Sequence, residues 1–312
     1  MDTTIGIVWN PTKCERSDLE DPAQKVLDEQ GASASLHWFE TTAEDPGHGP
    51  AREALEAGCT LVIAAGGDGT VRAVAEEVAG TEAHLGIIPQ GTGNLLARNL
   101  DIPLGIDAAV EHALTQPGRA IDMGWAEMEI DGEQQTHGFL VMVGFGVDAQ
   151  MITETDENLK DTIGWVAYAE AMGRAIAASD LVDLELGIDE ADPQQVQGHT
   201  LLIANCGTIT GGMRLLPDAR PDDGLLDVLM VSAAGITGWA DALKTLTWDN
   251  GLKRLLPGTD DEAATSDNVA QHQAHTLRVR LSSAQAVEID GEEIGETATV
   301  TARLDSGALT VR

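Results

Sequence analysis

The sequence predicts two domains, an α/β domain with a doubly wound parallel sheet and an all-β domain built as an antiparallel sandwich. Strand-like and helix-like segments alternate over residues 1–124, whereas strand-like segments dominate over residues 125–303. Alternation favours a parallel sheet covered on both faces, and a series of short strands with turn signals favours a sandwich. Two glycine-rich motifs, each between a strand and a helix, predict a ligand site in the first domain.

Each element of the first domain is predicted from its hydrophobic pattern. Short apolar runs at 60–65 and 85–88 are typical of buried strands, and a further strand is expected at 4–9. Helices are expected in five segments, at 21–30, 50–57, 71–79, 95–99 and 106–115. The alternation of these segments along the chain predicts βαβ units, in which the strands run parallel.

The second domain is predicted from strand-like runs separated by turns. The expected strands cover residues 124–130, 135–143, 181–188, 200–205, 225–231, 276–281 and 286–289. Asp-Gly pairs at 131–132, 223–224 and 290–291 separate several of them, and such pairs favour tight turns. The polar, acidic stretch at 259–273 is expected to be a mobile loop.

The motif Gly-Gly-Asp-Gly-Thr at residues 66–70 lies between a predicted strand and a predicted helix. Such a turn presents backbone N–H groups at a helix N-terminus, where the helix dipole also favours an anion. Glycine lets a phosphate approach the backbone closely, and Asp68 supplies a carboxylate that could hold a magnesium ion. Taken alone, the motif is equally compatible with an ordinary tight turn of an α/β domain.

A second motif, Pro-Gln-Gly-Thr-Gly-Asn at residues 89–94, also follows a strand and opens a helix. At the ends of neighbouring parallel strands, the two glycine-rich turns would face each other across one crevice, where open α/β sheets bind their ligands. Neither turn matches the P-loop or the dinucleotide fingerprint. The P-loop lysine is therefore missing, and backbone dipoles and a metal ion would have to neutralise the phosphate charge.

These motifs are part of a longer series that resembles one family along nearly the whole chain. The series comprises Asn10-Pro11-Thr12, the two glycine-rich turns, RAIDMG at 119–124, GFGVDA at 144–149, GGM at 211–213, PDARPDDGLLDV at 217–228 and EIDGE at 288–292. It resembles the diacylglycerol kinase catalytic family, in particular its soluble prokaryotic lipid kinases, which are related to sphingosine and ceramide kinases. The resemblance implies a fold like that of diacylglycerol kinases and NAD kinases. Residues 1–124 would bind the nucleotide, residues 125–303 would bind the lipid, and the last strand, 304–312, would return to the first domain.

The resemblance also implies roles for individual residues, with ATP and Mg²⁺ as cofactors. ATP would be bound by Asn10, Pro11, Thr12, Thr41, Thr42, Gly66, Gly67, Asp68, Gly69, Thr70, Gly91, Thr92 and Asn94. The catalytic set would be Asp68 and Asp122 in a magnesium network, Asp290, and Glu292 as the general base toward the acceptor hydroxyl. A structural Mg²⁺ would be held by the Asp223 side chain and by the carbonyls of Arg220 and Leu225. The residues alone favour a plain hairpin turn at 290–291.

Two positions depart from the pattern of the resembled family. Leu95 stands where many soluble members have an aspartate of the magnesium network, and Arg72 stands where an asparagine is common. The first departure leaves the network one acid short, and it leaves the lipid open between diacylglycerol and a sphingoid-like lipid. A turnover-deficient homologue that binds lipid or nucleotide is one alternative. An NAD kinase-like phosphotransferase is another, although its Asn-Glu motif is missing here.

The composition is strongly acidic, with 52 Asp and Glu against 18 Lys and Arg and a formal charge of −34. The acids are dispersed along the chain, which is typical of a solvated surface. Such a charge indicates adaptation to molar intracellular salt, where the Debye length falls to ~3 Å and self-repulsion is screened. It argues against nucleic acid as a partner. The expected partner is a membrane-derived lipid at the bilayer surface, and a homodimer is also compatible with the sequence.

No run of ~18 apolar residues predicts a transmembrane helix, and the first residues lack the basic region of a signal peptide. The expected location is therefore the cytoplasm, with transient association at the inner face of the membrane. A helix expected at 236–256 carries Trp239 and Trp248, which are candidates for lining an acyl entrance or touching the membrane. Cys59 and Cys206 have no metal-ligand spacing and are expected in the core.

Overall fold

The computed structural model describes residues 3–146, 181–209, 214–232 and 269–312. Contacts divide the chain into two compact units. The first unit comprises Met1–Met123, Pro221–Gly224 and Asp305–Arg312, and the second comprises Gly124–Arg220 and Leu225–Leu304. The segment Pro221–Gly224, which the sequence pattern assigns to the second domain, therefore belongs to the first unit.

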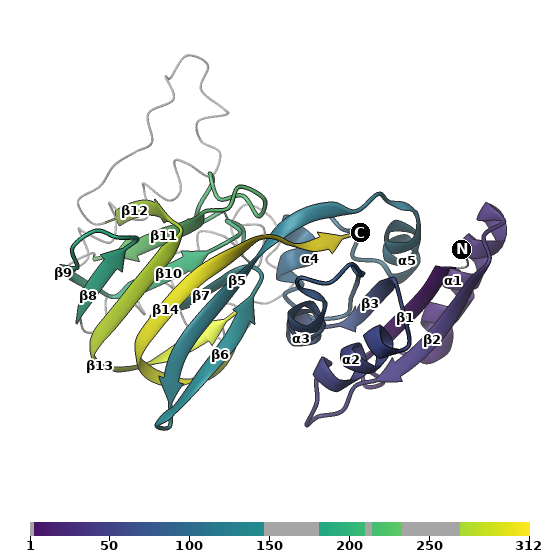
Figure 1. The fold of residues 1–312 in the computed structure, drawn as a ribbon, viewed down its shortest axis with the longest axis horizontal. Coiled ribbons are helices and arrows are strands. Elements are labelled where there is room, and N and C mark those ends of the chain that lie inside the picture. The colour runs from purple at the N-terminus through teal and green to yellow at the C-terminus, as the bar shows by residue number, and fades with distance from the viewer. Residues whose placement is uncertain (1–2, 147–180, 210–213, 233–268) are drawn as a thin grey trace, which may run out of the picture. The chain divides into compact units, whose positions relative to one another are not determined.

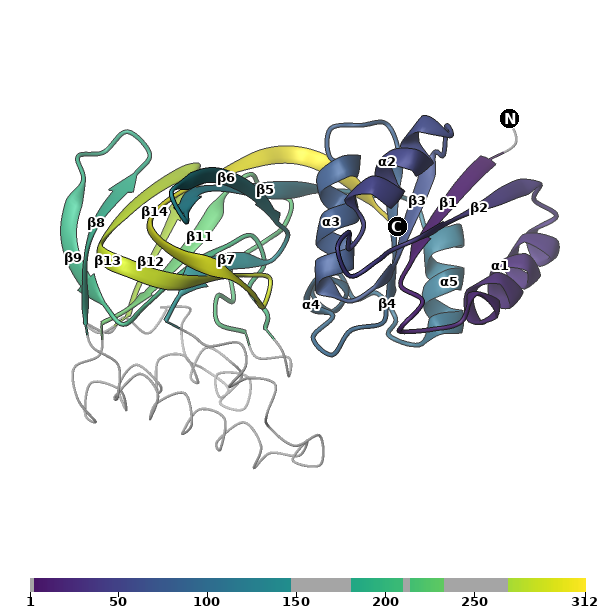
Figure 2. The ribbon, with the colours of Figure 1, turned by 90° about the horizontal axis from the view of Figure 1, so that it is seen from below.

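The first unit contains a parallel sheet with the strand order β4-β3-β1-β2. Its strands are β1 (Thr3–Trp9), β2 (Ala34–Glu40), β3 (Leu61–Gly66) and β4 (His84–Pro89). Its helices are α1 (Arg16–Gln30), α2 (His48–Glu56), α3 (Asp68–Val78), α4 (Leu95–Asn99) and α5 (Ile106–Thr115). Helix α1 packs against α5 and α2 against α3, and Figure 2 shows the two pairs on opposite sides of the sheet. This arrangement confirms the predicted doubly wound α/β domain.

Burial explains why the central strands of this sheet are almost entirely apolar. All six residues of β3 are buried, since helices cover both faces of the sheet. On one face, Ile5, Ile7 and Ile63 belong to a cluster that includes Leu19 of α1 and Val110 of α5. Full burial of side chains of this size contributes ~1.5–3 kcal/mol each to folding.

Helix α1 begins at Arg16, five residues before the expected start at residue 21. The backbone N–H of Glu15 donates to the Asp18 carboxylate (2.9 Å) as part of a capping box at the helix N-terminus. The Arg16 side chain then pairs with Glu20, and its Cζ atom lies 4.6 Å from the ring centre of Trp38. These polar contacts stabilise the first turn of the helix, before residue 21. The pattern of apolar residues does not reveal this turn, because the contacts are made by polar side chains.

The last strand of the chain completes the sheet of the first unit. β14 (Glu292–Val311) places its final two residues beside β4 in a parallel pairing. The backbone N–H of Arg312 donates to the Leu85 carbonyl (2.9 Å), and Arg312 Nε donates to His84 Nδ1 (2.9 Å). Because Nδ1 accepts this bond, the neutral His84 ring carries its proton on Nε2.

We expect the stability of the fold to depend on the protonation of His84. Burial lowers the pKa of His84 below its usual value of 6.5, and the positive charge of Arg312 lowers it further. The unfolded chain then binds the proton more tightly than the folded chain. The free energy of unfolding should therefore fall as the pH drops below about 6.5.

Denaturant unfolding between about pH 7.5 and pH 5 measures this dependence in wild type and in His84→Gln. In His84→Gln, the free energy of unfolding should depend less on pH than in wild type. The control His37→Gln, at an exposed position of β2, should show the same pH dependence as wild type. Identical slopes for wild type and His84→Gln would contradict the assignment.

The second unit is built from antiparallel strands (Figure 1). They are β6 (Glu133–Phe139), β7 (Met142–Phe145), β8 (Val182–Ile188), β9 (Gln194–Gly198), β10 (Thr200–Ala204), β11 (Leu226–Val231), β12 (Val269–Ala274), β13 (Thr276–Ile289) and the greater parts of β5 (Arg119–Ile130) and β14. Paired strands run in the order β12-β11-β10-β7-β13-β14, while β6 pairs with β5 and β9 with β8. Phe139, Val143, Leu201 and Ile289 belong to one buried cluster among these strands. The all-β antiparallel prediction is confirmed.

Two predicted strand boundaries of the second unit are wrong. The strand expected at 135–143 is two strands, β6 and β7, because the N–H groups of Leu140 and Val141 bind a side chain instead of a neighbouring strand. The two strands expected at 276–281 and 286–289 are one strand, β13, with a register irregularity in its middle.

The prediction of a loop at 259–273 is wrong for residues 269–273, because these residues belong to β12, which pairs with β11. Its polar sequence hides the strand, in which Gln273 Nε2 donates to Asp227 Oδ1 (3.1 Å) across the pair. The sequence pattern does not reveal β9 either, because its residues are mostly glutamine. The helix expected at 236–256, with its two tryptophans, and the motif residues 147–149 and 211–213 lie outside the described residues.

Candidate active site

The loops that follow the four parallel strands of the first unit lie at one edge of the sheet. β1 pairs with β2 on one side and with β3 on the other, and the connections from β1 and β3 lead to helices on opposite faces. Open α/β sheets bind ligands outside the carboxyl ends of the strands at such a switch point. The candidate site is built there from residues 10–15, 41–47, 66–68 and 90–94.

Asn10 holds the loop after β1 in shape. Its side-chain Oδ1 accepts hydrogen bonds from the backbone N–H (2.9 Å) and the hydroxyl (2.7 Å) of Thr12, and its carbonyl accepts the N–H of Lys13 (3.0 Å). The N–H of Asn10 donates to the Ala65 carbonyl in β3 (3.1 Å), which ties this loop to the first glycine-rich turn. Pro11 and Thr12 are exposed. These bonds give the loop a defined shape.

Cys14 lies in the same loop as a neutral thiol. Burial raises the pKa of this half-buried thiol, and the negative charge of Asp18 raises it further. A thiol with a raised pKa is a weak nucleophile at neutral pH. Cys59 and Cys206 are buried, as expected, and burial raises the pKa of the Cys59 thiol as well.

The loop after β2 carries Thr41 and Thr42, the two threonines expected to reach the nucleotide. Thr41 is only 5% exposed, and its backbone N–H donates to the last carbonyl of β1 (3.0 Å), whereas Thr42 is exposed. Asp45 shapes the rest of the loop, since its carboxylate accepts the N–H groups of Gly47 (3.0 Å) and Gly49 (2.9 Å) at the start of α2. Thr42 is the better placed of the two threonines to meet a ligand.

The first glycine-rich turn leads directly into α3, which begins at Asp68 and not at the expected residue 71. Asp68, Gly69 and Thr70 therefore form the first helical turn, whose N–H groups have no carbonyl partner within the helix. Thr70 is only 5% exposed because its side chain covers Gly66, where an added Cβ would lie 2.5 Å from the Thr70 Cβ. Gly67, Asp68 and Gly69 are partly exposed, so this stretch can meet a phosphate.

The two glycine-rich turns lie against each other, backbone to backbone. A Cβ added to Gly91 would lie 2.8 Å from the Cα of Gly67 and 3.5 Å from the backbone nitrogen of Asp68. A Cβ added to Gly93 would lie 2.9 Å from Asp68 Oδ2. Only glycine leaves room for this approach, so the two motifs form one continuous surface in the first unit.

Asp68 ties the second turn to the first. Its Oδ2 accepts the N–H of Asn94 (2.8 Å), and its Oδ1 accepts the N–H of Leu95 (2.6 Å), at the N-terminus of α4. The Asn94 side chain closes its own turn, because it accepts from the N–H of Gly91 and donates to the Gly91 carbonyl, each at 2.8 Å. Leu95 is 6% exposed and contributes its N–H where the resembled family has a carboxylate.

Arg98 belongs to this site although no motif contains it, and Gly93, which lies within the second motif, is not among the residues expected to bind ATP. Arg98 Nε donates to the Gly93 carbonyl (2.8 Å), so the end of α4 holds the second turn, while Thr92 is exposed at its tip. The glycine itself is a signal of close packing. The contact between residues 93 and 98 has no sequence signature.

Asp122, the second acid expected in the magnesium network, is buried in β5 at 1% exposure. One carboxylate oxygen accepts the N–H of Gly224 and the other accepts the N–H of Gly307, both at 2.7 Å. The N–H of Asp122 donates to the Pro221 carbonyl (2.7 Å). These bonds explain why Pro221–Gly224 belongs to the first unit. The role of Asp122 as a magnesium ligand stays a prediction.

The remaining catalytic candidates, Asp290 and Glu292, lie in the second unit. Asp290-Gly291 forms the predicted tight turn between β13 and β14, and both residues have positive φ angles (50° and 85°). Asp290 is only 4% exposed. Glu292, the first residue of β14, is exposed, so it is the one of the two acids that presents its side chain at the surface.

The donor set of the first unit fits a magnesium ion in kind, since Mg²⁺ prefers oxygen ligands and a carboxylate oxygen can accept more than one bond. Over the described ranges, no three or more His, Cys, Asp or Glu side chains are grouped to hold a metal ion. The residues expected to hold a structural Mg²⁺ belong to different units. Asp223, which is exposed, belongs to the first unit, and Arg220 and Leu225 belong to the second.

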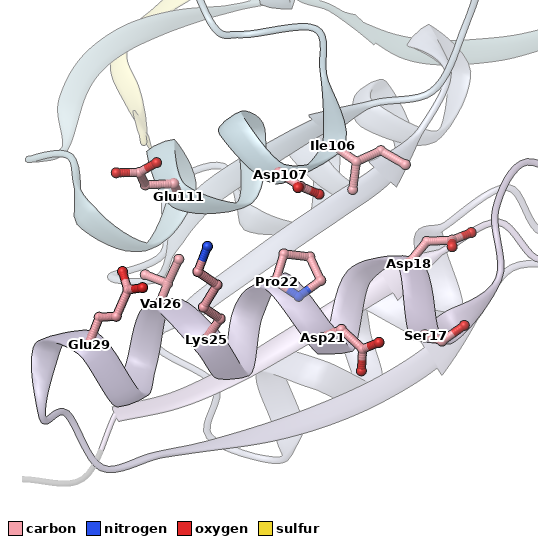
Figure 3. Close-up of a pocket in the computed structure, with 10 residues that line it drawn as sticks. All are labelled: Ser17, Asp18, Asp21, Pro22, Lys25, Val26, Glu29, Ile106, Asp107 and Glu111. Atoms are coloured by element: carbon pink, nitrogen blue, oxygen red, sulfur yellow. The ribbon is translucent and has the colours of Figure 1, made fainter.

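A groove of about 490 Å³ lies elsewhere in the first unit, between α1 and α5 (Figure 3). None of its lining residues belongs to the glycine-rich turns. Its acidic side chains would repel the phosphates of a nucleotide, so the groove is not the candidate site. The lining residues are Ser17, Asp18, Asp21, Pro22, Lys25, Val26, Glu29, Ile106, Asp107 and Glu111.

Comparison with known families agrees with this geometry. Residues 4–126 match the diacylglycerol kinase catalytic domain, and residues 141–312 match the YegS C-terminal NAD kinase beta sandwich-like domain. The chain therefore belongs to the diacylglycerol kinase catalytic-domain family of lipid kinases, in the group that carries this C-terminal domain. The family predicted from the motifs is confirmed.

The chain is similar to curated and solved proteins over most of its length. A Pseudomonas fluorescens protein described as "Probable lipid kinase YegS-like" is 34% identical over 268 residues, which cover 83% of this chain and 79% of that protein. The diacylglycerol kinase of Bacillus subtilis (strain 168) is 27% identical over 293 residues, with coverage of 92% and 88%. A crystal structure of a diacylglycerol kinase from Bacillus anthracis str. Sterne has the same fold, with a TM-score of 0.66 at 20% identity and coverage of 99% and 96%.

Proposed function

We propose that this protein transfers the terminal phosphoryl group of ATP to a hydroxyl group of a lipid, with Mg²⁺ as a cofactor. Membership of a lipid kinase family supports the reaction class. The observation that carries the nucleotide site is the backbone contact between Gly67 and Gly91, with Asp68 bonded across the two turns. Two glycine-rich turns held together at a helix N-terminus offer a surface of N–H groups that suits a polyphosphate.

The phosphates would be bound mainly by the backbone. The two glycine-rich turns contain no lysine, so their N–H groups and the dipole of α3 would orient the triphosphate. Mg²⁺ supplies the remaining charge neutralisation when it is bound, and Asp68 and Asp122 are the acids proposed to hold it. Phosphoryl transfer relies chiefly on such positioning and charge neutralisation.

Glu292 is proposed as the general base. Its carboxylate would take the proton of the lipid hydroxyl as that oxygen bonds to the γ-phosphorus, while the bond to the β–γ bridging oxygen breaks and ADP leaves. A lipid hydroxyl is a poor nucleophile, and a positioned base contributes ~10²–10⁴ in rate. The exposed position of Glu292, directly after a tight turn, supports both access and orientation.

The proposed acceptor is diacylglycerol or a sphingoid-like lipid at the bilayer surface. The Bacillus subtilis relative is named a diacylglycerol kinase, which supports the first, while Leu95 in place of an acid keeps the second open. Among the described helices, none is long and apolar enough to cross a membrane. Because the formal charge is −34, approach to an anionic bilayer should require high salt, which screens the repulsion.

ADP release from magnesium ATP in ~2–3 M KCl tests this proposal. The acceptors are dispersed diacylglycerol, a sphingoid base and NAD, each compared with a sample that lacks an acceptor. Lipid-dependent release supports the proposal and names the lipid class, whereas turnover with NAD alone would assign the NAD kinase reaction. ATP binding without turnover on any acceptor would support a second candidate, a binding protein, which the apolar Leu95 motivates.

Asp68→Asn is expected to weaken ATP binding by about 10- to 100-fold. The new NH₂ group would face one of the two N–H donors of Asn94 and Leu95, so a charge-assisted bond worth roughly 1.5–3 kcal/mol is lost. Calorimetric titration with ATP measures the change. Asp107→Asn is the matched control, because Asp107 is an exposed acid in the first turn of α5. Wild-type affinity in Asp68→Asn would show that the carboxylate does not hold the turns.

A further inference from the structure

We infer that Asp290 is a positioning residue that fixes the geometry of Glu292, because it anchors the hairpin between β13 and β14 to residues 140–142. This inference rests on the proposed role of Glu292 as the general base. Asp290 lies two residues before Glu292 and is only 4% exposed, so its carboxylate acts on the protein and not on the substrate.

Three consecutive backbone N–H groups converge on the Asp290 carboxylate. Oδ2 accepts the N–H of Leu140 (2.9 Å), and Oδ1 accepts the N–H groups of Val141 (2.8 Å) and Met142 (2.9 Å). In the opposite direction, the N–H of Asp290 donates to the Met142 carbonyl (2.9 Å). A carboxylate is stable in a buried position only with such compensation. The four bonds together hold both the side chain and the backbone of the turn.

Residues 140–142 are themselves held from the other side. The Val141 carbonyl accepts the N–H groups of Asn205 (2.8 Å) and Cys206 (3.1 Å). The Leu140 carbonyl accepts Asn205 Nδ2 (3.2 Å) and the Cys206 thiol (3.5 Å). All four of these residues are at most 1% exposed. One carboxylate therefore attaches the hairpin to the end of β10 and to the core of the second unit.

The connection from this anchor to Glu292 is short. Ile289 pairs with Glu292 across the turn, so Asp290 and Gly291 are the whole loop. Both have the positive φ angles of a type I′ turn, and a fixed first residue sets the direction in which β14 leaves. Glu292 is exposed and follows this loop directly, so the anchored turn sets the point and the direction from which its side chain leaves the backbone.

A second hairpin of the same unit provides a matched control. Asp131-Gly132 joins β5 to β6 with φ angles of 53° and 80°, close to those of Asp290-Gly291. Asp131 is exposed, and its carboxylate accepts no hydrogen bond within the described part of the chain. Asparagine suits both turns, so an Asp→Asn change preserves the turn and removes an anchor only at Asp290.

A double-mutant cycle of Asp290→Asn and Glu292→Gln, measured as kcat for lipid phosphorylation, tests the inference. Asp290→Asn is expected to lower kcat about 10- to 100-fold, with little change in the KM for ATP. It should have no further effect in the Glu292→Gln background, and Asp131→Asn should leave kcat unchanged. Equal losses of kcat in both backgrounds would overturn the inference, because Asp290 would then act independently of Glu292.

Hydrogen–deuterium exchange separates this inference from the proposed function. In Asp290→Asn the N–H groups of residues 140–142 and 290–293 should exchange faster than in wild type, and in Asp131→Asn they should not. Unchanged protection in Asp290→Asn would overturn the anchor even if the enzyme phosphorylates lipid. If wild type phosphorylates no lipid, the proposed function fails and the positioning role fails with it, whereas faster exchange would leave the anchor itself standing.

Discussion

Glu292→Gln is expected to lower kcat for lipid phosphorylation by ~10²–10⁴ while the Kd for ATP stays within about twofold of wild type. Glutamine keeps the size of the side chain and its exposed place at the start of β14, but it cannot take up the proton. ATP affinity should not change, because the residues expected to bind ATP belong to the first unit, whereas Glu292 belongs to the second. Steady-state kinetics with a lipid acceptor and titration with ATP measure the two effects.

Glu293→Gln is the control for this variant. Glu293 is the next residue of the same strand and is also exposed, but neighbouring strand residues point to opposite faces. This variant should keep wild-type kcat. A Glu292→Gln enzyme with wild-type kcat would contradict the assignment of the base, and equal losses in both variants would indicate an effect of charge alone.

Gly91→Ala is expected to weaken ATP binding by more than about 100-fold. The new Cβ would lie 2.8 Å from the Cα of Gly67 and 3.0 Å from Asn94 Oδ1. A backbone atom cannot rotate away as a side chain can, so the two glycine-rich turns must separate and the surface of N–H groups is lost. The free energy of unfolding should also fall by roughly 1–3 kcal/mol, as in other overpacked sites. Calorimetric titration and denaturant unfolding measure the two changes.

Gly105→Ala is the matched control for this substitution. Gly105 precedes α5 with a φ of −82°, and an added Cβ there would have no atom within 4 Å. It should bind ATP as wild type does. If Gly91→Ala also bound ATP with wild-type affinity, the contact between the turns would not be part of the nucleotide site.

The fold of the first unit follows from local patterns. The apolar runs before the two glycine-rich motifs predict β3 and β4 to within about two residues, and α5 has the expected bounds, Ile106–Thr115. Local polar contacts are harder to read. The capping box at Glu15 and Asp18 lengthens α1, and Asp68 begins α3 earlier than the apolar pattern suggests.

Contacts between residues far apart in the chain are what the sequence does not reveal. Asp122 binds Gly307, 185 positions away, and this side chain helps bring Pro221–Gly224 into the first unit. Asp290 binds Leu140, 150 positions away, and thereby interrupts a segment whose composition is that of one continuous strand. Neither bond has a periodicity or spacing by which a single sequence could show it.

The candidate site is predictable in outline and not in detail. The motifs correctly indicate two turns that meet at the carboxyl edge of a parallel sheet. They do not indicate that the Thr70 side chain is buried against Gly66. They also do not indicate that the two carboxylate oxygens of Asp68 accept hydrogen bonds from the N–H groups of Asn94 and Leu95. Those features depend on how the turns pack, which only the folded chain determines.

Transfer of radiolabel from γ-labelled ATP into an extracted lipid product tests the central claim most directly. The reaction contains magnesium ATP and dispersed diacylglycerol or sphingoid base in ~2–3 M KCl, with wild type and Glu292→Gln in parallel. The proposed function predicts label in a phosphorylated lipid with wild type and a loss of ~10²–10⁴ in rate with the variant. Label that never enters lipid, although ATP binds to the protein, would contradict it.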